Sequence, residues 1–568
     1  MPVWPFCTST AARRNQRITH VRTRLATKLA HPPPEFLAQD AENANDVTLG
    51  TASELAEALA TGRVTAERAV LAYGRRLLAA HAQTNCLTEV FLEEALARAR
   101  HLDAEYHATG KPVGKLHGLP ISVKDMYCVA GSDATLGYST FIDQPSASNA
   151  LMVEILLREG AIIIAKTNVP QMMLSFECSN PVFGRTVNPY NLKFTSGGSS
   201  GGEGALIALR GAAIGVGTDI GGSLRLPAHF CGIYSLKPSA GRVPMAGNFS
   251  VKAGAENLVS VAGPMANSVD DLQLFCESVL TDMHLRRDPA ALPMPWNPSL
   301  CTLPANRPLR IGVYTHDGFS APVPAVIRAV RETAAALEVA GHTLVPFTVP
   351  APLEMMRIAY DLLLQDNARA IMKPVVDAKD PIEPSAIKLV RLLRLPQWVR
   401  NVLVKVMSWL GETRTAMFIH AMRAKSAHDV HATVAARDRY RAAFHQQWMD
   451  LDLDFLICPV SAMVANPHNT FSDLAGTASH TLLYNVIDFT TGIVPVTRVA
   501  VTDTFEQSRP AENDRLHRAI YEIYDPAAMA GLPVGIQIVG RRLDEELVLA
   551  AMHEVVRCLG KAREALGA

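Results

Sequence analysis

The sequence lacks the features that mark several large classes of protein. It has no net formal charge, because 54 lysine and arginine residues balance 54 aspartate and glutamate residues, and this gives no indication of nucleic acid as a partner. It has no run of 18 apolar residues, so we expect no membrane-spanning helix. It also has no HExxH or EF-hand pattern, and no Lys-Ser or Lys-Thr pair follows its glycine-rich segments. We therefore expect no metal, no phosphate-binding loop and no cofactor.

Paired cysteines are also missing. The nine cysteines are scattered, odd in number and without a CxxC spacing, which indicates reduced thiols in an intracellular protein. The apolar content of 48% is typical of a large globular protein with a substantial core. We expect a cytoplasmic protein or one associated peripherally with a membrane.

Acidic residues are absent from the first 34 positions, which carry six arginines and lysines. The long apolar stretch of a secretory signal is missing there. Three interpretations stay open: an organelle transit peptide, a basic arm on an anionic membrane, or a disordered extension. We predict a basic, partly disordered N-terminal extension over residues 1–48, followed by one domain over 49–568.

Strand and helix patterns alternate through that domain. Residues 119–123 and 161–165 are short β-branched runs typical of buried strands, and the helix-like stretch 148–159 separates them. The segment from about 49 to 106 is rich in Ala, Leu, Glu and Arg at helical spacing, with a helix start at Thr51. Further strands are predicted at 309–314, 455–458 and 534–539, with helices near 324–340 and 543–558. This order predicts an α/β fold.

Residues 385–411 depart from the pattern, because they contain five basic residues and no acidic residue. Pro396 divides the segment, and its second half carries apolar residues, including Trp398, on one helical face. Two interpretations stay open: a core-facing helix with solvated charges, or a basic amphipathic helix that lies in a membrane interface.

Two loops rich in serine and glycine contain the predicted chemistry. Residues 195–204 read TSGGSSGGEG and residues 217–225 read GTDIGGSLR, with an apolar segment between them. Glycines at this density let backbone N–H groups approach a reacting atom that a Cβ would crowd. A third segment, ISVKD at 121–125, places a lysine in an apolar run. Together these segments predict amide hydrolysis by a serine nucleophile.

We assign the catalytic roles to Ser223, Ser199 and Lys124. Ser223 would attack, and Ser199 would relay its proton to a neutral Lys124 and return it to the leaving nitrogen. The pKa of a lysine is near 10.4 in water, so burial must lower it by about 2–3 units, at roughly 3–4 kcal/mol. Asp125 would point to the opposite face if this segment is a strand.

Backbone N–H groups of the second loop would stabilise the oxyanion, each typically by about 3–4 kcal/mol in the transition state. The predicted donors are Ile220, Gly221, Gly222 and Ser223. Four neighbours are predicted to support the loops structurally: Ser200, Thr218, Asp219 and Arg225.

The motifs GGSSGGEGALIA at 197–208 and GVGTDIGGSLRLP at 215–227 resemble the amidase signature family, with Lys124 as the third catalytic element. The resemblance runs from about residue 49 to 560 and includes the spacing of 24 residues from Ser199 to Ser223. It implies a large central mixed β-sheet with α-helices on both faces. It also implies a cis peptide bond at Ser199.

Within that family the chain is most similar to the fatty acid amide hydrolase branch, through PQMMLSFECSNP at 170–181, LRLPQW at 393–398 and LYNVIDF at 483–489. The resemblance implies long-chain fatty amides such as N-acylethanolamines as substrates, a membrane-facing cap at 385–411 and a homodimer. Met173 would hold the substrate amide through its carbonyl. Leu174 and Tyr524, at or near aromatic positions of the branch, would line a reshaped acyl channel. Because the branch's N-terminal spanning helix is missing, membrane contact would be peripheral.

Alternatives from other classes stay open at this point. Residues 198–202 also fit GxSxG with Ser200 as nucleophile, although the strand that this motif needs directly before it is not indicated. The chain could hydrolyse small aliphatic or aryl amides. It could also carry lipids without turning them over, or serve as an amidotransferase subunit.

Overall fold

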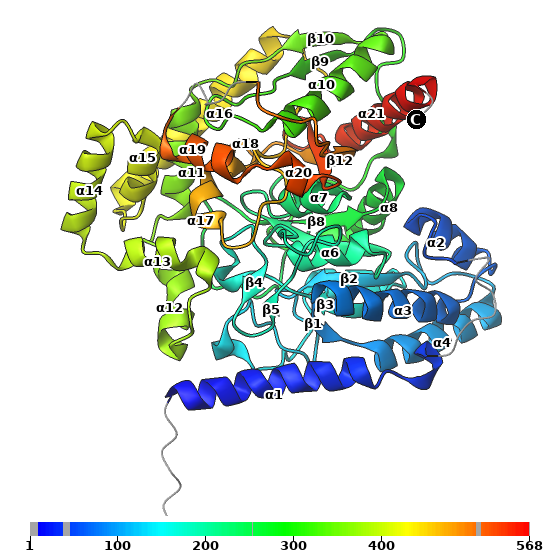
Figure 1. The fold of residues 1–568 in the computed structure, drawn as a ribbon. Coiled ribbons are helices and arrows are strands. Elements are labelled where there is room, and N and C mark those ends of the chain that lie inside the picture. Colours follow the sequence, from blue (N-terminus) through cyan, green and yellow to red (C-terminus); the bar gives the residue numbers. More distant parts are fainter. Residues whose placement is uncertain (1–9, 38–45, 253, 507–512, 567–568) are drawn as a thin grey trace, which may run out of the picture.

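A mixed β-sheet of eleven strands runs through the protein (Figure 1). The computed structural model describes residues 10–37, 46–252, 254–506 and 513–566. Across the sheet the strands are β1 (Leu87–Val90), β3 (Ile162–Thr167), β2 (Pro120–Lys124), β6 (Ile214–Asp219), β8 (Val261–Ala266), β7 (Tyr234–Lys237), β12 (Thr491–Arg498), β13 (Pro533–Val539), β11 (Phe455–Pro459), β9 (Arg310–Val313) and β10 (Thr343–Pro346). A separate two-stranded ribbon consists of β4 (Ser179–Asn180) and β5 (Gly184–Arg185). The predicted α/β class and mixed sheet are confirmed.

Helices pack on both faces of the sheet. The first half of the chain contributes α2 (Ala52–Ala60), α3 (Ala66–Thr84), α4 (Leu92–Thr109), α5 (Leu151–Arg158), α6 (Gly201–Ala208), α7 (Arg225–Cys231), α8 (Val269–Val279) and α9 (Asp282–Leu285). The second half contributes α10 (Pro324–Val339), α11 (Pro352–Leu363), α12 (Arg369–Ala378), α15 (Thr413–Ala421), α16 (Ala427–Asp450), α17 (Phe471–Leu474), α18 (Ser479–Val486), α19 (Arg515–Ile523), α20 (Pro526–Met529) and α21 (Glu545–Leu566). Strands β7, β8 and β12 contact α6 or α7 as well as α8 or α21.

Local sequence signals explain several of these boundaries. Thr51 caps α2 as predicted: its side chain accepts from Glu54 N at 3.1 Å, and Glu54 accepts from Thr51 N at 2.8 Å. The helical spacing over about 49–106 corresponds to α2, α3 and α4, and the sequence analysis missed strand β1 between α3 and α4. Asn85, with φ 53°, ends α3, and the next residues pair antiparallel with β3. A short strand between two helical patterns leaves almost no periodicity of its own.

Helix α1 (Thr10–Ala30) lies along the base of the molecule (Figure 1). It buries Ile18, Val21 and Leu25, and Lys28 Nζ donates to Glu89 in β1 at 2.8 Å. Residues 10–37 therefore pack on the domain in the structure, which differs from the expected partly disordered extension over 1–48. The basic composition of the first 34 residues did not indicate this packing, because carboxylates that pair with its basic side chains, such as Glu89, lie far along the chain. Residues 1–9 and 38–45 lie outside the described residues.

Two helices occupy the 385–411 segment, α13 (Ile387–Arg394) and α14 (Gln397–Trp409), separated at Pro396. Helix α13 buries Leu389 and Val390 against the core, whereas most side chains of α14 are partly or fully exposed. In the described parts of the chain, no helix combines the length and the apolar character needed to cross a bilayer. All eight cysteines of the described residues carry free thiols, as the sequence predicts.

Candidate active site

The three segments singled out in the sequence meet at one edge of the sheet. Strands β2 and β6 are parallel neighbours, with Val123 paired to Val216, so their carboxyl ends lie side by side. Lys124 is the last residue of β2, and Thr218 lies near the end of β6. Loops that follow carboxyl ends of parallel strands are where α/β proteins build their sites.

Lys124 lies fully buried at this edge. Its Nζ is 2.7 Å from Ser199 Oγ and 2.9 Å from Thr218 Oγ1. Burial lowers the pKa of Lys124 to about 7, and the carboxylate of Asp219 opposes this shift only in part. Asp125 faces the other way, because its carboxylate accepts from Thr88 Oγ1 at 2.9 Å. The neutral and protonated forms of the amine are therefore about equally populated near pH 7.

Ser199 and Ser223 stand at the starts of α6 and α7. The Gly198–Ser199 peptide bond is cis, as the resemblance implied. Ser200 N donates to Ser223 O at 3.3 Å, which ties the two loops together. In the part of the chain that the structure describes, no hydrogen bond joins Ser199 Oγ to Ser223 Oγ, although both residues line the same cavity. The geometry thus contains the Lys124–Ser199 link and leaves Ser223 open toward the cavity.

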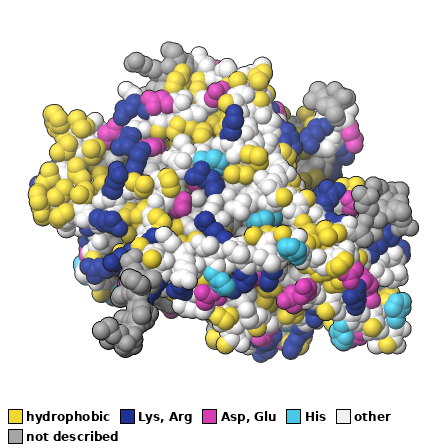
Figure 2. Space-filling view, turned by 60° about the horizontal axis from the view of Figure 1, so that its bottom comes forward, with side chains coloured by type: hydrophobic (Ala, Val, Ile, Leu, Met, Phe, Trp, Pro, Cys, Tyr) yellow, Lys and Arg dark blue, Asp and Glu magenta, His cyan; other side chains and the backbone are white. Residues whose placement is uncertain are grey.

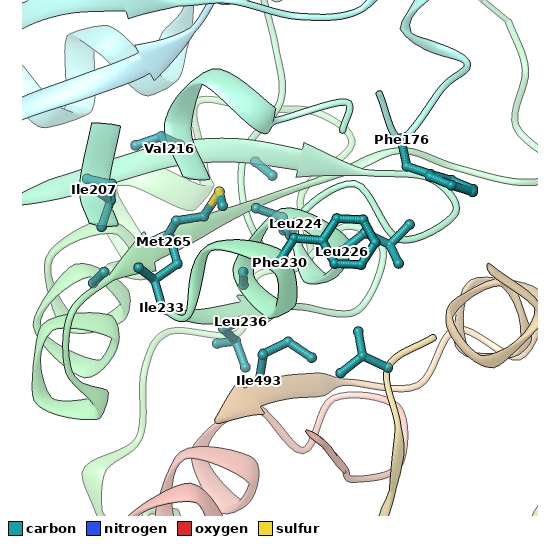
Figure 3. Close-up of a cluster of buried hydrophobic side chains, with 14 of the residues drawn as sticks. Phe176, Ile207, Val216, Leu224, Leu226, Phe230, Ile233, Leu236, Met265 and Ile493 are labelled. Atoms are coloured by element: carbon teal, nitrogen blue, oxygen red, sulfur yellow. The ribbon is translucent and has the colours of Figure 1, made fainter. Parts of the chain in front are cut away.

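A buried core anchors the Ser223 loop. Leu224, Leu226 and Phe230 follow Ser223 into α7 and pack among apolar side chains from the sheet, including Met265 and Ile493 (Figure 3). Such packing holds the loop in one conformation before substrate arrives.

A buried ion pair fixes the turn around Ser223. Arg225 contacts both carboxylate oxygens of Asp219 at 3.0 Å, and Asn485 Nδ2 donates to the same carboxylate at 2.9 Å. Burial alone would raise the pKa of Asp219, but the neighbouring Arg225 guanidinium holds this pKa well below its usual range. Ser200 Oγ lies 3.3 Å from both the N and the O of Thr218. All four predicted supporting residues thus contact the loops.

The predicted set of oxyanion donors needs one correction. Gly222 N already donates to Asp219 Oδ1 at 2.8 Å, so this N–H is not aimed at a substrate. Gly222 is instead required for shape: its φ is 129°, and a Cβ would lie 2.5 Å from Thr481 Oγ1. Ile220, Gly221 and Ser223 line the cavity beside it, so their N–H groups stay candidates.

Glu203 was missed by the sequence analysis. Its carboxyl is fully buried in α6 and accepts from Ser122 Oγ at 2.5 Å and Thr167 Oγ1 at 2.8 Å. Burial raises the pKa of Glu203 to about 7. The available signal was a single acid inside the otherwise apolar run GGEGALIA. Glu203 links β2, β3 and α6 directly behind Lys124.

Two of the three predicted substrate contacts lie at the site. Met173 and Leu174 line both cavities that reach Ser223, and Met172 and Met173 have φ values of 66° and 50°. Tyr524 lies elsewhere, which corrects the expectation. Its hydroxyl donates to Asp503 O at 3.0 Å and its ring packs on Phe505, so it lines neither cavity.

Two cavities approach Ser223 with different linings. One, of about 100 Å³, is apolar and includes Ile220, Gly221, Phe176 and Leu482. We call it the apolar cavity. The other, of about 110 Å³, has a polar part and includes Ser199, Thr218, Ser250, Lys252 and Ser260. We call it the polar cavity.

A third cavity of about 340 Å³ extends the apolar cavity toward α13 and α15. The two share Tyr360, Leu389, Phe418, Phe471 and Ala475. A path therefore leads from Ser223 to the base of α13. Most of its lining is apolar, so we call it the apolar path, but charged side chains, among them Lys388, Arg414 and Asp473, line its outer part.

Comparison with known proteins assigns the chain to a family. A sequence-family profile described as "Amidase" matches residues 68–549. An acetamidase of Emericella nidulans is 36% identical over 519 residues, covering 90% of each chain. Fatty-acid amide hydrolase 1 of Sus scrofa is 34% identical over 520 residues, covering 90% of this chain and 86% of that protein.

A solved structure titled "Fatty acid amide hydrolase" superposes with a TM-score of 0.81 at 27% identity, covering 98% of this chain and 92% of that one. The folds agree over nearly the whole length. The chain belongs to the amidase signature family, and its activity is amide hydrolysis.

Proposed function

We propose that the protein hydrolyses fatty acid amides through an acyl-enzyme on Ser223. Ser223 Oγ attacks the carbonyl carbon while its proton passes to Ser199, which hands its own proton to neutral Lys124. The C–N bond then breaks as the proton returns through Ser199 to the leaving nitrogen. Water next attacks the Ser223 ester and releases the acid. Substrate binding completes the Ser199–Ser223 hydrogen bond, because catalytic hydrogen bonds tighten in the Michaelis complex.

The position of Ser199 sets the direction of the substrate. Ser199 lines the polar cavity and is absent from the lining of the apolar cavity. The group that protonates the leaving nitrogen must lie beside it. We therefore place the amine part in the polar cavity and the acyl chain in the apolar cavity.

The apolar path from Ser223 to α13 carries the fatty amide assignment. A short acyl group would leave the cavity beyond Phe418 and Phe471 unfilled, whereas a long chain buries its methylenes along it. The similarity to fatty acid amide hydrolases supports this substrate class. The similarity to acetamidases supports a second candidate, small aliphatic amides.

A panel of amides with one amine and acyl chains from acetyl to hexadecanoyl separates the two candidates. We expect kcat/KM to rise about two- to fourfold per added methylene until the chain fills the apolar path, as each buried methylene contributes about 0.8 kcal/mol. Steady-state assays with soluble or detergent-dispersed substrate measure this. A maximum of kcat/KM at the acetyl member of the panel, followed by a steady decline with chain length, would instead assign the acetamidase activity.

We also propose that α14 binds peripherally to a membrane surface. Trp398 and Trp409 are 70% and 84% exposed, and Val402, Val406 and Leu410 add to the same exposed apolar surface. Figure 2 shows a patch of hydrophobic side chains where α14 projects in Figure 1, with basic side chains nearby. Exposed apolar surface beside basic residues favours an anionic bilayer. Substrate would then pass from the bilayer to the apolar path at α13.

The double variant Trp398→Ser, Trp409→Ser tests this proposal. We expect its affinity for phosphatidylglycerol-containing vesicles to fall at least tenfold, because two exposed indole rings no longer enter the interface. Vesicle sedimentation measures the binding. Val339→Ser, which removes an 87% exposed side chain at the end of α10, is the matched control and should bind like the wild type. Equal binding by both variants would refute membrane contact through α14.

A further inference from the structure

The lining of the polar cavity contains a lysine, Lys252, in addition to the catalytic residues Ser199 and Ser223. Lys252 lines this cavity together with the hydroxyl-bearing residues Ser250 and Ser260, whereas the lining of the apolar cavity has no lysine, arginine, histidine, aspartate or glutamate. The orientation argued above places the amine part of the substrate on this side of Ser223. The end of the leaving group therefore meets a cation.

The Lys252 ammonium has spare hydrogen-bonding capacity. Its Nζ donates to Leu363 O at 3.0 Å. Among the residues described by the structure, no ion pair within 4.0 Å is formed by Lys252 Nζ, so no direct carboxylate partner competes for it. Burial lowers the pKa of Lys252, and the more distant charge of Asp366 opposes this shift in part. An ammonium has three N–H donors, so two remain for a ligand.

Other polar groups near Lys252 form hydrogen bonds with the backbone or with one another. Lys252 N donates to Ser250 Oγ at 3.1 Å, which fixes the turn that carries the lysine. Asp366 accepts from Ala370 N at 2.9 Å, and Asn257 Nδ2 donates to Gln365 at 3.3 Å. The half-buried cation is thus held at the cavity by its own turn.

We infer that Lys252 determines specificity by binding a carboxylate on the nitrogen substituent of the substrate, so that N-acyl amino acids are preferred over neutral amides of the same size. This inference rests on the proposed function, because it needs the amine part in the polar cavity. A carboxylate one carbon from the amide nitrogen accepts charge-assisted hydrogen bonds from Nζ, whereas a hydroxyl in that place gains much less.

Two probes with one acyl chain test the inference: N-dodecanoylglycine and N-dodecanoylethanolamine, which place a carboxylate and a hydroxymethyl at equivalent positions. The readout is the ratio of their kcat/KM values. We expect a ratio above one in the wild type and a fall of about tenfold to hundredfold in Lys252→Met. Lys252→Arg, which keeps the charge, should keep the ratio within threefold of the wild type.

Lys373→Met is the matched control, because Lys373 on α12 is exposed and paired with Asp377. Its ratio should equal that of the wild type. A fall of less than fivefold in Lys252→Met overturns the inference. If that variant does not fold, as judged by its melting curve, a wild-type ratio below one overturns it instead. Failure of the wild type to hydrolyse either probe would contradict the proposed function, whereas hydrolysis of the neutral probe with an unchanged ratio would contradict the role of Lys252 alone.

Discussion

Replacing Ser223 by alanine is expected to lower kcat by about 10⁴–10⁶-fold, with the fold unchanged. The Ser223 hydroxyl is the nucleophile of the proposed mechanism, and the neighbouring groups are engaged in other hydrogen bonds. Ser199 contacts the amine of Lys124, and Gly222 N is engaged by Asp219. Single-turnover assays on a long-chain amide measure the loss, and the melting curve reports folding.

Ser200→Ala is the matched control for that variant. Ser200 is a buried serine one residue from Ser199, but its Oγ contacts only the backbone of Thr218 among the described residues. Its loss removes a supporting hydrogen bond, so we expect kcat to fall by about tenfold or less. A larger loss in Ser200→Ala than in Ser223→Ala would favour Ser200 as nucleophile. Retained hydrolysis by Ser223→Ala would exclude the mechanism, and retained lipid binding without hydrolysis would agree with it.

Removing the amine in Lys124→Ala is expected to lower kcat by about 10³–10⁴-fold, because the relay then has no base. Lys124→Arg should be equally inactive, since a guanidinium stays protonated at working pH. Stopped assays with the purified variants measure both losses.

The control for this pair is Lys166→Met, which removes another fully buried lysine from the adjacent strand β3. Lys166 Nζ donates to Asp133 O and lies 4.0 Å from Asp125, so its loss should reduce stability more than kcat. If Lys124→Ala retained kcat within tenfold of the wild type, or lost no more than Lys166→Met, Lys124 would not be the base.

Much of this site could be predicted because its parts lie in continuous motifs. The two glycine-rich loops and the lysine after Val123 are each local, and the parallel pairing of β2 with β6 brings them together. The burial of Lys124 was likewise foreseeable, because it ends the mostly apolar strand β2. The alternation of strand and helix patterns along the chain was enough to predict the α/β class.

What could not be predicted depends on contacts between distant residues. Asn485 reaches Asp219 across 266 positions, and Glu177 accepts from Asn469 N, 292 positions away. The engagement of Gly222 N by Asp219 is a matter of turn geometry that composition does not reveal. Tyr524 was assigned by resemblance to a position near the channel, yet its hydroxyl is satisfied by Asp503 O.

The central claim is that a neutral Lys124 drives the reaction, and the pH dependence of wild-type kcat/KM tests it most directly. With a pKa of about 7, the neutral fraction is about one tenth at pH 6 and about one hundredth at pH 5, so kcat/KM should rise about tenfold per pH unit and level above pH 8. Because the pKa of Glu203 is also about 7, the same inflection must persist in Glu203→Gln. A profile that is flat from pH 5 to 9, or an inflection that disappears in Glu203→Gln, would contradict the account.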